Sequence, residues 1–239
     1  MTLPGGSQRA AVGLFAHDRR CGAARVAGAD EAGRGCLAGP LVAASVCIDL
    51  GRLTHAERRA LGDLDDSKRL IPAVRERLAA AIWVIAEQVV VVSADAATID
   101  RDGLHRTNLR LLTRVLGGLD PVPGACLVDG FALGADAIAH RPIAGGDRTS
   151  AAIAAASVVA KVTRDRMMRA LAGRYPDYGF DEHMGYATPR HRAAIARFGP
   201  SAIHRRSFAS AAYAAYAARG QAALRAPEGA RRSPRQRSR

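Results

Sequence analysis

Residues 24–35 read Ala-Arg-Val-Ala-Gly-Ala-Asp-Glu-Ala-Gly-Arg-Gly and place two acids between a short apolar run and a glycine-rich turn. The run over residues 24–30 predicts a short strand that ends in Asp30 and Glu31, and residues 33–35 predict a turn after it. A pair of carboxylates at a strand end is therefore the starting point for both the fold and the chemistry.

Further apolar runs predict the rest of the sheet and its helices. We expect strands over residues 40–49, 89–94 and 125–129, and within 136–143. We expect helices over residues 72–87, 98–116, 148–172, 189–198 and 200–218. Strands crowd the first half of the chain and helices dominate the second. This order indicates an α/β fold with helices on both sides of a central sheet.

The two ends of the chain differ in composition from its middle. We expect residues 1–22 to be a flexible leader, residues 23–218 to form a single domain, and residues 219–239 to be a disordered tail. The tail carries seven arginines and one acid, which supply six of the formal net charge of +13. Such a balance suits a polyanionic partner, either nucleic acid or an acidic membrane surface. The alternative is a solvated, arginine-rich surface.

Cysteine usage and hydropathy indicate the compartment. The four cysteines form no Cys-x-x-Cys pair, which argues against a zinc site or a disulfide framework and favours a reducing cytosol. No apolar run approaches the roughly 18 residues that span a membrane. The first 22 residues contain Asp18, Arg19 and Arg20 and lack the apolar core of a signal peptide. We therefore expect a cytoplasmic protein, and a monomer.

Four acidic residues follow apolar runs or close a glycine turn. Asp30, Glu31 and Asp129 end predicted strands, and Asp147 follows Gly145 and Gly146. Carboxylates at the ends of adjacent strands can converge, and hard cations such as Mg²⁺ or Mn²⁺ relieve their repulsion. Two such ions can hold the attacking and leaving oxygens of a phosphodiester displacement. The alternative for any one of these acids is a helix or turn cap.

Asp30 and Glu31 raise a geometric difficulty. Adjacent residues of a strand point to opposite faces, so both side chains cannot project straight into one centre. Either the strand ends at Asp30, or one of the two residues contributes partly through its backbone carbonyl.

Lysine usage gives a second, independent signal. Only two of the 35 basic residues are lysines, Lys68 and Lys161. A compact ammonium and a planar guanidinium are not interchangeable, so these positions indicate a need for the former near a phosphate or a carboxylate. The alternative is that both are chance survivors.

Seven short blocks resemble, in order, the signatures of the ribonuclease HII family, over about residues 24–210. The blocks are Gly28-Ala-Asp-Glu-Ala-Gly-Arg-Gly35, Asp66-Ser-Lys68, Val128-Asp-Gly130, Gly146-Asp147, Ile153-Ala-Ala-Ala-Ser-Val-Val-Ala-Lys-Val-Thr-Arg-Asp165, Gly185-Tyr-Ala-Thr188 and His204-Arg-Arg-Ser-Phe208. The resemblance implies a ribonuclease H-like fold, with a mixed central sheet of about five strands, flanking helices and a helical C-terminal part. Residues 23–218 would then be the catalytic domain.

The resemblance also implies a role for each matching position. The catalytic acids, which would bind two divalent ions (Mn²⁺ or Mg²⁺), are Asp30, Glu31, Asp129 and Asp147. Gly33, Arg34 and Gly35 would place backbone groups against the 2′-hydroxyl of a ribonucleotide, because glycines allow close approach. Tyr186 would stack beneath the sugar of the following nucleotide. Lys68, Ser157 and Lys161 complete the implied substrate-binding set.

The implied activity is metal-dependent cutting of the RNA strand of RNA–DNA hybrids, with a part in DNA replication and repair. Ribonucleotides embedded in duplex DNA would be nicked on their 5′ side, leaving 3′-hydroxyl and 5′-phosphate ends. Two alternatives from other classes stay open. One is a different two-metal nuclease on the same fold. The other is a non-catalytic, basic nucleic-acid binder, whose affinity the acids would weaken unless metal neutralised them.

Two positions depart from the family pattern. Lysine is common there before the Gly-Asp and Gly-Tyr pairs, whereas this chain has Gly145 and Met184. Both changes remove positive charge near the expected cleft and bear on phosphate binding more than on the reaction. We hypothesise that basic neighbours substitute, namely Arg148, Arg190 and Arg192.

Several residues that invite a catalytic role receive structural interpretations. For His183, His191 and His204 we favour phosphate contact or structure over catalysis, since the neighbourhood is rich in arginine. Asp165 is interpreted as an ion-pair partner or a structural acid. The aromatic residues Trp83, Tyr213 and Tyr216 are interpreted as core or helix packing.

Overall fold

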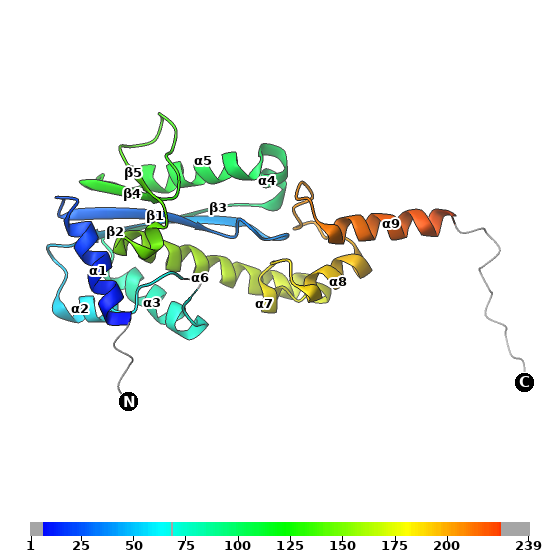
Figure 1. Ribbon diagram of the computed structural model, residues 1–239, viewed down its shortest axis with the longest axis horizontal. Helices are drawn as coiled ribbons and strands as arrows, with labels where there is room; N and C mark the ends of the chain where they lie inside the picture. The colour runs from blue at the N-terminus through cyan, green and yellow to red at the C-terminus, as the bar shows by residue number, and fades with distance from the viewer. Residues whose placement is uncertain (1–6, 68, 226–239) are drawn as a thin grey trace, which may run out of the picture.

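The computed structural model describes residues 7–67 and 69–225, and its centre is a five-stranded sheet in the order β3-β2-β1-β4-β5 (Figure 1). The strands are β1 (Arg25–Ala32), β2 (Leu41–Asp49), β3 (Gln88–Ala94), β4 (Ala125–Asp129) and β5 (Arg141–Ile143). β2 is antiparallel to both of its neighbours, β1 and β3, whereas β4 runs parallel to β1 and β5 parallel to β4. The predicted mixed sheet is confirmed.

Helices cover both faces of this sheet (Figure 1). On one side lie α6 (Ala151–Arg174) and α3 (Pro72–Ile85), and on the other lie α4 (Ala96–Asp102) and α5 (Leu104–Gly117). Because β1 and β2 are central and covered twice, they are buried almost throughout and show no polar alternation. The α/β class that the sequence predicts is therefore confirmed.

Gly28 allows the longest helix to lie directly against the central strand. A Cβ atom at this position would lie 2.1 Å from the backbone nitrogen of Ile153, far closer than any real contact. Alanines and valines then bury the first turns of α6 against β1 and β2. The start of α6 is thus held close to the end of β1, where the acidic residues lie.

The C-terminal part is helical, as expected. It contains α7 (Phe180–His183), α8 (Pro189–Phe198) and α9 (Ala211–Arg225), with a 3₁₀ turn at Pro176–Tyr178 (η2). An isolated bridge between Ala38 and His204 joins this part to the segment after β1. None of the helices in the described ranges is long and apolar enough to cross a membrane.

The expected flexible leader is wrong for residues 7–22. Residues Ser7–Arg19 form helix α1, which packs against α6 and buries Ala11, Leu14 and Phe15. Asp18 is fully buried, and its carboxylate accepts the backbone N–H of Ala152 at 2.9 Å. The first turn of a helix has N–H groups without partners, so this acid from a distant helix caps α6. Residues 1–6 lie outside the described ranges.

Several helix boundaries also differ from the sequence prediction. The helix expected over residues 98–116 is two helices, because Gly103 has a φ of 83° and breaks the run. A short helix that was not expected, α2 (His55–Ala60), begins with a capping box between Thr54 and Glu57. Trp83 was expected in the core and is 52% exposed.

The C-terminal boundaries differ most. The helix expected from residue 200 begins at Ala211, since residues 201–210 turn back to form the bridge with Ala38. Its end is Arg225, beyond the expected limit of 218. The rest of the predicted tail, residues 226–239, is outside the described part of the chain.

Candidate active site

A cleft of about 400 Å³ opens at the end of β1. Its walls are formed by Glu31, Ala32, Gly33, Arg34, Gly35, Ser67, Asp129, Ser157, Lys161 and Tyr186. The cleft therefore unites two of the four predicted acids with every predicted substrate residue except Lys68, which is not among the described residues. Segments from β1, β4, α6 and the C-terminal part meet here.

Asp30 and Glu31 lie inside β1 and point to opposite sides of the sheet. On this strand Val26 packs into the core beneath α6, whereas Ala29 packs into the core beneath α5. By alternation Asp30 faces α6, where Ser157 is its neighbour, and Glu31 faces α5, where Asn108 is its neighbour. The strand does not end at Asp30, because it continues to Ala32; a contribution through a backbone carbonyl stays a prediction.

Asp129 joins the two acids from the neighbouring strand. The parallel register pairs Ala29 with Val128, so the next residues along the strands, Asp30 and Asp129, lie side by side. The Oδ1 atom of Asp129 accepts the backbone N–H of Gly146 at 2.6 Å. A Cβ on Gly146 would lie 2.5 Å from Cδ1 of Ile153, so a glycine is needed for this close approach.

Asp147 comes from a turn and not from a strand of the sheet. It lies in the 3₁₀ turn Gly146–Arg148 (η1), directly after the residue that contacts Asp129, and it is 7% exposed. It is not one of the residues that line the cleft. The structure thus brings Asp30, Glu31 and Asp129 together, and Asp147 follows Gly146, the residue that binds Asp129.

The electrostatics of the three acids favour a bound cation. Burial, followed by the charges of Glu31 and Asp129, raises the pKa of Asp30 well above its usual value. Burial also raises the pKa of Glu31, although Arg34 opposes the shift. The Oε2 atom of Glu31 is buried and has no hydrogen-bond partner among the described residues. A divalent ion would satisfy this oxygen and neutralise the repulsion, so an oxygen-only donor set fits Mg²⁺ or Mn²⁺.

The carboxylates are neighbours and do not yet form a coordination cage. Within the described residues, no three acidic, histidine or cysteine side chains are grouped so that they could enclose a metal ion. Asn108 approaches Glu31, yet its amide nitrogen has no hydrogen-bond partner in the part of the chain described. Asn108 was not among the predicted site residues, although it carries a signal: it is a polar residue on the buried face of α5.

Arg34 is held at the rim of the cleft by two contacts. Its Nη1 atom lies 3.4 Å from Oε1 of Glu31, and its guanidinium carbon lies 5.1 Å from the ring centroid of Phe131. The edge of Phe131 in turn meets His105, with ring centroids 5.4 Å apart. Phe131 is 40% exposed and follows Asp129 by two residues, and the sequence analysis did not single it out. Its exposure beside a candidate catalytic acid could be recognised only in the fold.

Two buried arginines hold the segment from Gly33 to Pro40, here called the recognition loop. Arg164 donates to the carbonyl oxygens of Ala38, Pro40 and Met184 at 2.9–3.0 Å. Arg205 donates to the carbonyl oxygens of Gly33, Arg34 and Gly39 at 2.7–3.1 Å. These bonds tie the loop carbonyls to two buried guanidinium groups. Both side chains lie in blocks that the sequence analysis quoted, yet their role was not anticipated.

Lys161 and Tyr186 also line the cleft. The Nζ atom of Lys161 lies 2.7 Å from Oδ1 of Asp165 and 5.5 Å from the ring centroid of Tyr186. Asp165 is therefore an ion-pair partner, as interpreted from the sequence. The Oγ atoms of Ser157 and Ser67 are 2.9 Å apart, which joins α6 to the loop before Lys68.

The two departures from the family pattern have a common backbone feature. Gly145 has a φ of 63° and Met184 a φ of 51°, both in the left-handed region. The arginines considered as substitutes, Arg148, Arg190 and Arg192, do not line the cleft. Arg190 pairs instead with Glu182 on the surface. The geometry of the described residues therefore gives the substitution hypothesis no support.

Comparison with known proteins places this arrangement among relatives. The family model described as Ribonuclease HII matches residues 27–211. The Ribonuclease HII of Mycobacterium avium (strain 104) is 47% identical over 189 residues, covering 79% of this chain and 80% of the relative. That of Parafrankia sp. (strain EAN1pec) is 44% identical over 239 residues, covering 98% and 92%. The crystal structure of ribonuclease H2 from Pyrococcus horikoshii OT3 has a TM-score of 0.69 at 27% identity, covering 82% of this chain and 99% of that one.

Proposed function

The chain belongs to the ribonuclease HII family, and we propose that this ribonuclease H depends on divalent metal and nicks duplex DNA 5′ of embedded ribonucleotides, besides cutting the RNA strand of hybrids. One observation carries the proposal. A single cleft combines the acids Glu31 and Asp129 with the recognition loop and with Tyr186. Acids alone would fit any two-metal nuclease, whereas the loop and the tyrosine supply a means to detect a 2′-hydroxyl.

The four acids are the residues that would hold the metal. Asp30, Glu31 and Asp129 are adjacent in space, and Asp147 would join them from the turn behind Asp129. Bound Mg²⁺ or Mn²⁺ would supply the activation of the attacking water and the stabilisation of the leaving 3′-oxygen, so that the products carry 3′-hydroxyl and 5′-phosphate ends. The protein itself supplies position and charge.

The recognition loop and the pair Tyr186 and Lys161 would select the substrate. Because Arg164 and Arg205 bind the loop carbonyls, the backbone amides of Gly33, Arg34 and Gly35 are available to a ribose 2′-hydroxyl. Tyr186, which also lines the cleft, is 38% exposed, and its ring offers a surface for the next sugar. The Lys161 ammonium beside it carries the positive charge that a phosphate requires, and Ser157 lies on the same helix. Lys68 is proposed to contribute a second ammonium.

The proposal includes the state of the protein in the cell. We propose a cytoplasmic monomer that binds RNA–DNA hybrids and ribonucleotide-containing duplexes during DNA replication and repair. It consists of one catalytic domain up to residue 218 and an arginine-rich tail. The contacts between α1 and α6 support counting the N-terminal helix as part of that domain.

The experiment that tests the proposal is a cleavage assay on duplex DNA with one embedded ribonucleotide. The reaction is run with Mn²⁺, with Mg²⁺ and with chelator, and an all-DNA duplex and the Asp129→Asn protein are the controls. Metal-dependent nicking 5′ of the ribonucleotide, absent from both controls, is the expected result. Tight binding without cleavage in any metal would favour a non-catalytic binder. Equal cutting of the all-DNA duplex would favour a different two-metal nuclease.

A further inference from the structure

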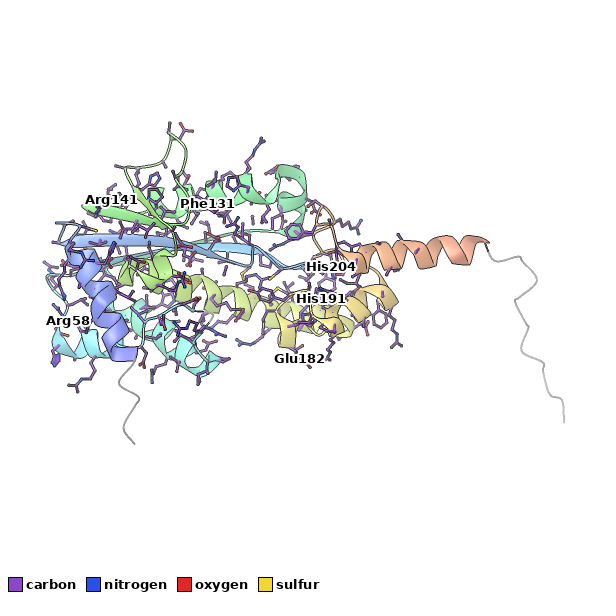
Figure 2. All side chains as sticks on the ribbon, in the orientation of Figure 1. Arg58, Phe131, Arg141, Glu182, His191 and His204 are labelled. Carbon is purple, nitrogen blue, oxygen red and sulfur yellow. The ribbon has the colours of Figure 1, made fainter. Side chains whose placement is uncertain are left out.

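Three histidines form a buried cluster beside the cleft, in which His191 and His204 lie side by side (Figure 2). The rings of His183 and His191 stack with centroids 4.4 Å apart, and the Phe180 ring meets His191 edge-on at 5.4 Å. His191 is completely buried and His204 is 2% exposed. None of the three histidines lines the cleft, so the proposed chemistry does not use them.

The contacts of this cluster determine where each proton lies. His191 Nδ1 is 2.9 Å from the carbonyl oxygen of Tyr186, which can only accept, so Nδ1 carries the proton of a neutral ring. His191 Nε2 is then an acceptor, and His204 Nε2, 3.0 Å away, donates to it. His204 Nδ1 is left as an acceptor and receives the backbone N–H of Ser201 at 2.9 Å. The backbone N–H of Ser201 can only donate, and the carbonyl oxygen of Tyr186 can only accept. Both ends therefore require that the hydrogen bonds run from Ser201 through His204 and His191 to Tyr186.

The chain of hydrogen bonds ends on the residue that forms one wall of the cleft. Tyr186 is held from both sides, since its own N–H donates to the carbonyl of His183 at 2.9 Å. His183 in turn accepts the N–H of Gly185 at Nδ1 and contacts the carbonyl of Tyr178 through Nε2 at 2.7 Å. The segment before Tyr186 contains the left-handed residue Met184, a conformation that needs support from its surroundings.

We propose that His191 and His204 are positioning residues: a directed pair of neutral imidazoles that fixes the backbone of Tyr186 and so sets where its ring meets the substrate sugar. This inference rests on the proposed role of Tyr186 in ribonucleotide selection. It assigns selectivity to two side chains that touch neither substrate nor metal.

Two features explain why imidazole suits these positions. Only imidazole offers one donor and one acceptor on opposite sides of a rigid ring, so that a bond received on one side is passed to the other. A proton added to His191 would set two N–H groups against each other across 3.0 Å, and a proton added to Nδ1 of His204 would face the backbone N–H of Ser201. Burial lowers the pKa values of both His191 and His204 to about 4, which keeps the pair neutral near pH 7.

The first test reads the protons directly and needs no variant. Nitrogen-15 NMR of the histidine-labelled full chain distinguishes the two neutral tautomers and the cation. We expect His191 as the Nδ1–H tautomer and His204 as the Nε2–H tautomer at pH 7. His191 protonated at Nε2, or either ring as a cation at that pH, would overturn the proposal.

The second test compares matched substitutions of one ring. His191→Asn retains an amide donor near the position of Nδ1, whereas His191→Gln places its amide near Nε2 and loses the donor to Tyr186. The readout is the ratio of kcat/KM on a single-ribonucleotide duplex to kcat/KM on a long hybrid. We expect about a tenfold fall in this ratio for the Gln variant and recovery in the Asn variant. Equal ratios in two folded variants would contradict the proposal.

The Tyr186→Ala variant distinguishes a failure of the histidine positioning role from a failure of the proposed role of Tyr186. If Tyr186→Ala loses selectivity and His191→Gln does not, the histidine pair has no positioning role and the proposed function stands. If Tyr186→Ala leaves the ratio unchanged, the role of Tyr186 in the proposed function is itself wrong. Thermal melting of each variant shows that it is folded before the ratios are compared.

Discussion

The Nη1 atom of Arg205 lies 2.7 Å from the carbonyl oxygen of Gly33, 172 residues away in sequence. Both Arg205 and Arg164 are completely buried, and within the described ranges neither guanidinium forms an ion pair. Buried charges of this kind are tolerated when hydrogen bonds satisfy their donors, and here the acceptors are backbone carbonyls. The helical C-terminal part thus shapes the recognition loop by binding its carbonyl groups.

Arg205→Met should therefore affect stability and selectivity together. The substitution leaves the carbonyl oxygens of Gly33, Arg34 and Gly39 without their donor, and we expect the free energy of unfolding to fall by about 3 kcal/mol. The loop amides would lose their alignment, so kcat/KM on the single-ribonucleotide duplex should fall more than on a long hybrid. Urea unfolding and the two cleavage rates check this.

Arg205→Lys is the matched control for charge. Lysine keeps the positive charge but cannot supply the planar fork that binds several carbonyls at once. We expect this variant to remain less selective than the wild-type protein. Full recovery of selectivity by lysine would show that the charge matters and the geometry does not.

Asp129→Asn should separate folding from catalysis. Asparagine keeps an oxygen for the N–H of Gly146 and removes one of the charges that raise the pKa of Asp30. In the absence of metal we expect the unfolding free energy to stay within about 1 kcal/mol of the wild-type value, or to rise. Turnover should be abolished. Normal turnover in the folded variant would refute the assignment of the acids.

Substitutions of Gly28 and Gly35 test how closely the backbone at each position approaches its neighbours. A Cβ on Gly28 would lie 2.1 Å from the backbone of Ile153, whereas a Cβ on Gly35 would meet no atom within 4 Å. We expect Gly28→Ala to destabilise the protein by at least about 3 kcal/mol, because neither β1 nor α6 can move without disturbing the core. Chemical denaturation measures the loss. A Gly28→Ala protein as stable as the wild type would mean that α6 does not lie directly on β1.

Gly35→Ala should have the opposite profile. The residue is exposed and lines the cleft, so an added methyl group faces the substrate and not the protein. We expect unchanged melting behaviour and reduced cleavage at the embedded ribonucleotide, with KM affected more than kcat. If cleavage were also unchanged, the sugar would not approach the recognition loop at this point.

The sequence predicted the features that depend on local pattern. Apolar runs located all five strands, and Asp30, inside β1, and Asp129, at the end of β4, lie side by side because these two strands are parallel neighbours. The pairing of Lys161 with Asp165 also follows from their spacing of one helical turn. The ribonuclease HII signatures indicated the fold that the comparisons confirm.

The features that depend on distant contacts could not be predicted. Asp18 looked like a residue of a polar leader, and only the position of Ala152 explains its burial. Arg164 and Arg205 lie in blocks quoted for the family resemblance, but nothing local shows that they bind backbone carbonyls. Asn108 carried a detectable signal on the buried face of α5, but its neighbour Glu31 is known only from the fold.

The buried histidines predict how stability depends on pH. The folded-state pKa values of His191 and His204 are about 4, below the ordinary value of 6.5. Between these values the unfolded chain binds protons that the folded protein does not, so stability is fully present above pH 6.5 and is lost as the pH falls toward 4. Each histidine contributes a slope of at most about 1.4 kcal/mol per pH unit to the unfolding free energy.

The raised pKa values of Asp30 and Glu31 change the stability in the opposite direction, so the pH dependence of the wild-type protein alone is ambiguous. The measurement is therefore the difference in unfolding free energy between wild type and His191→Asn, determined by urea titration from pH 7.5 to pH 4.5. We expect the stability advantage of the wild type to shrink as the pH falls. A difference that is constant over this range would show that His191 is not held neutral in the folded protein.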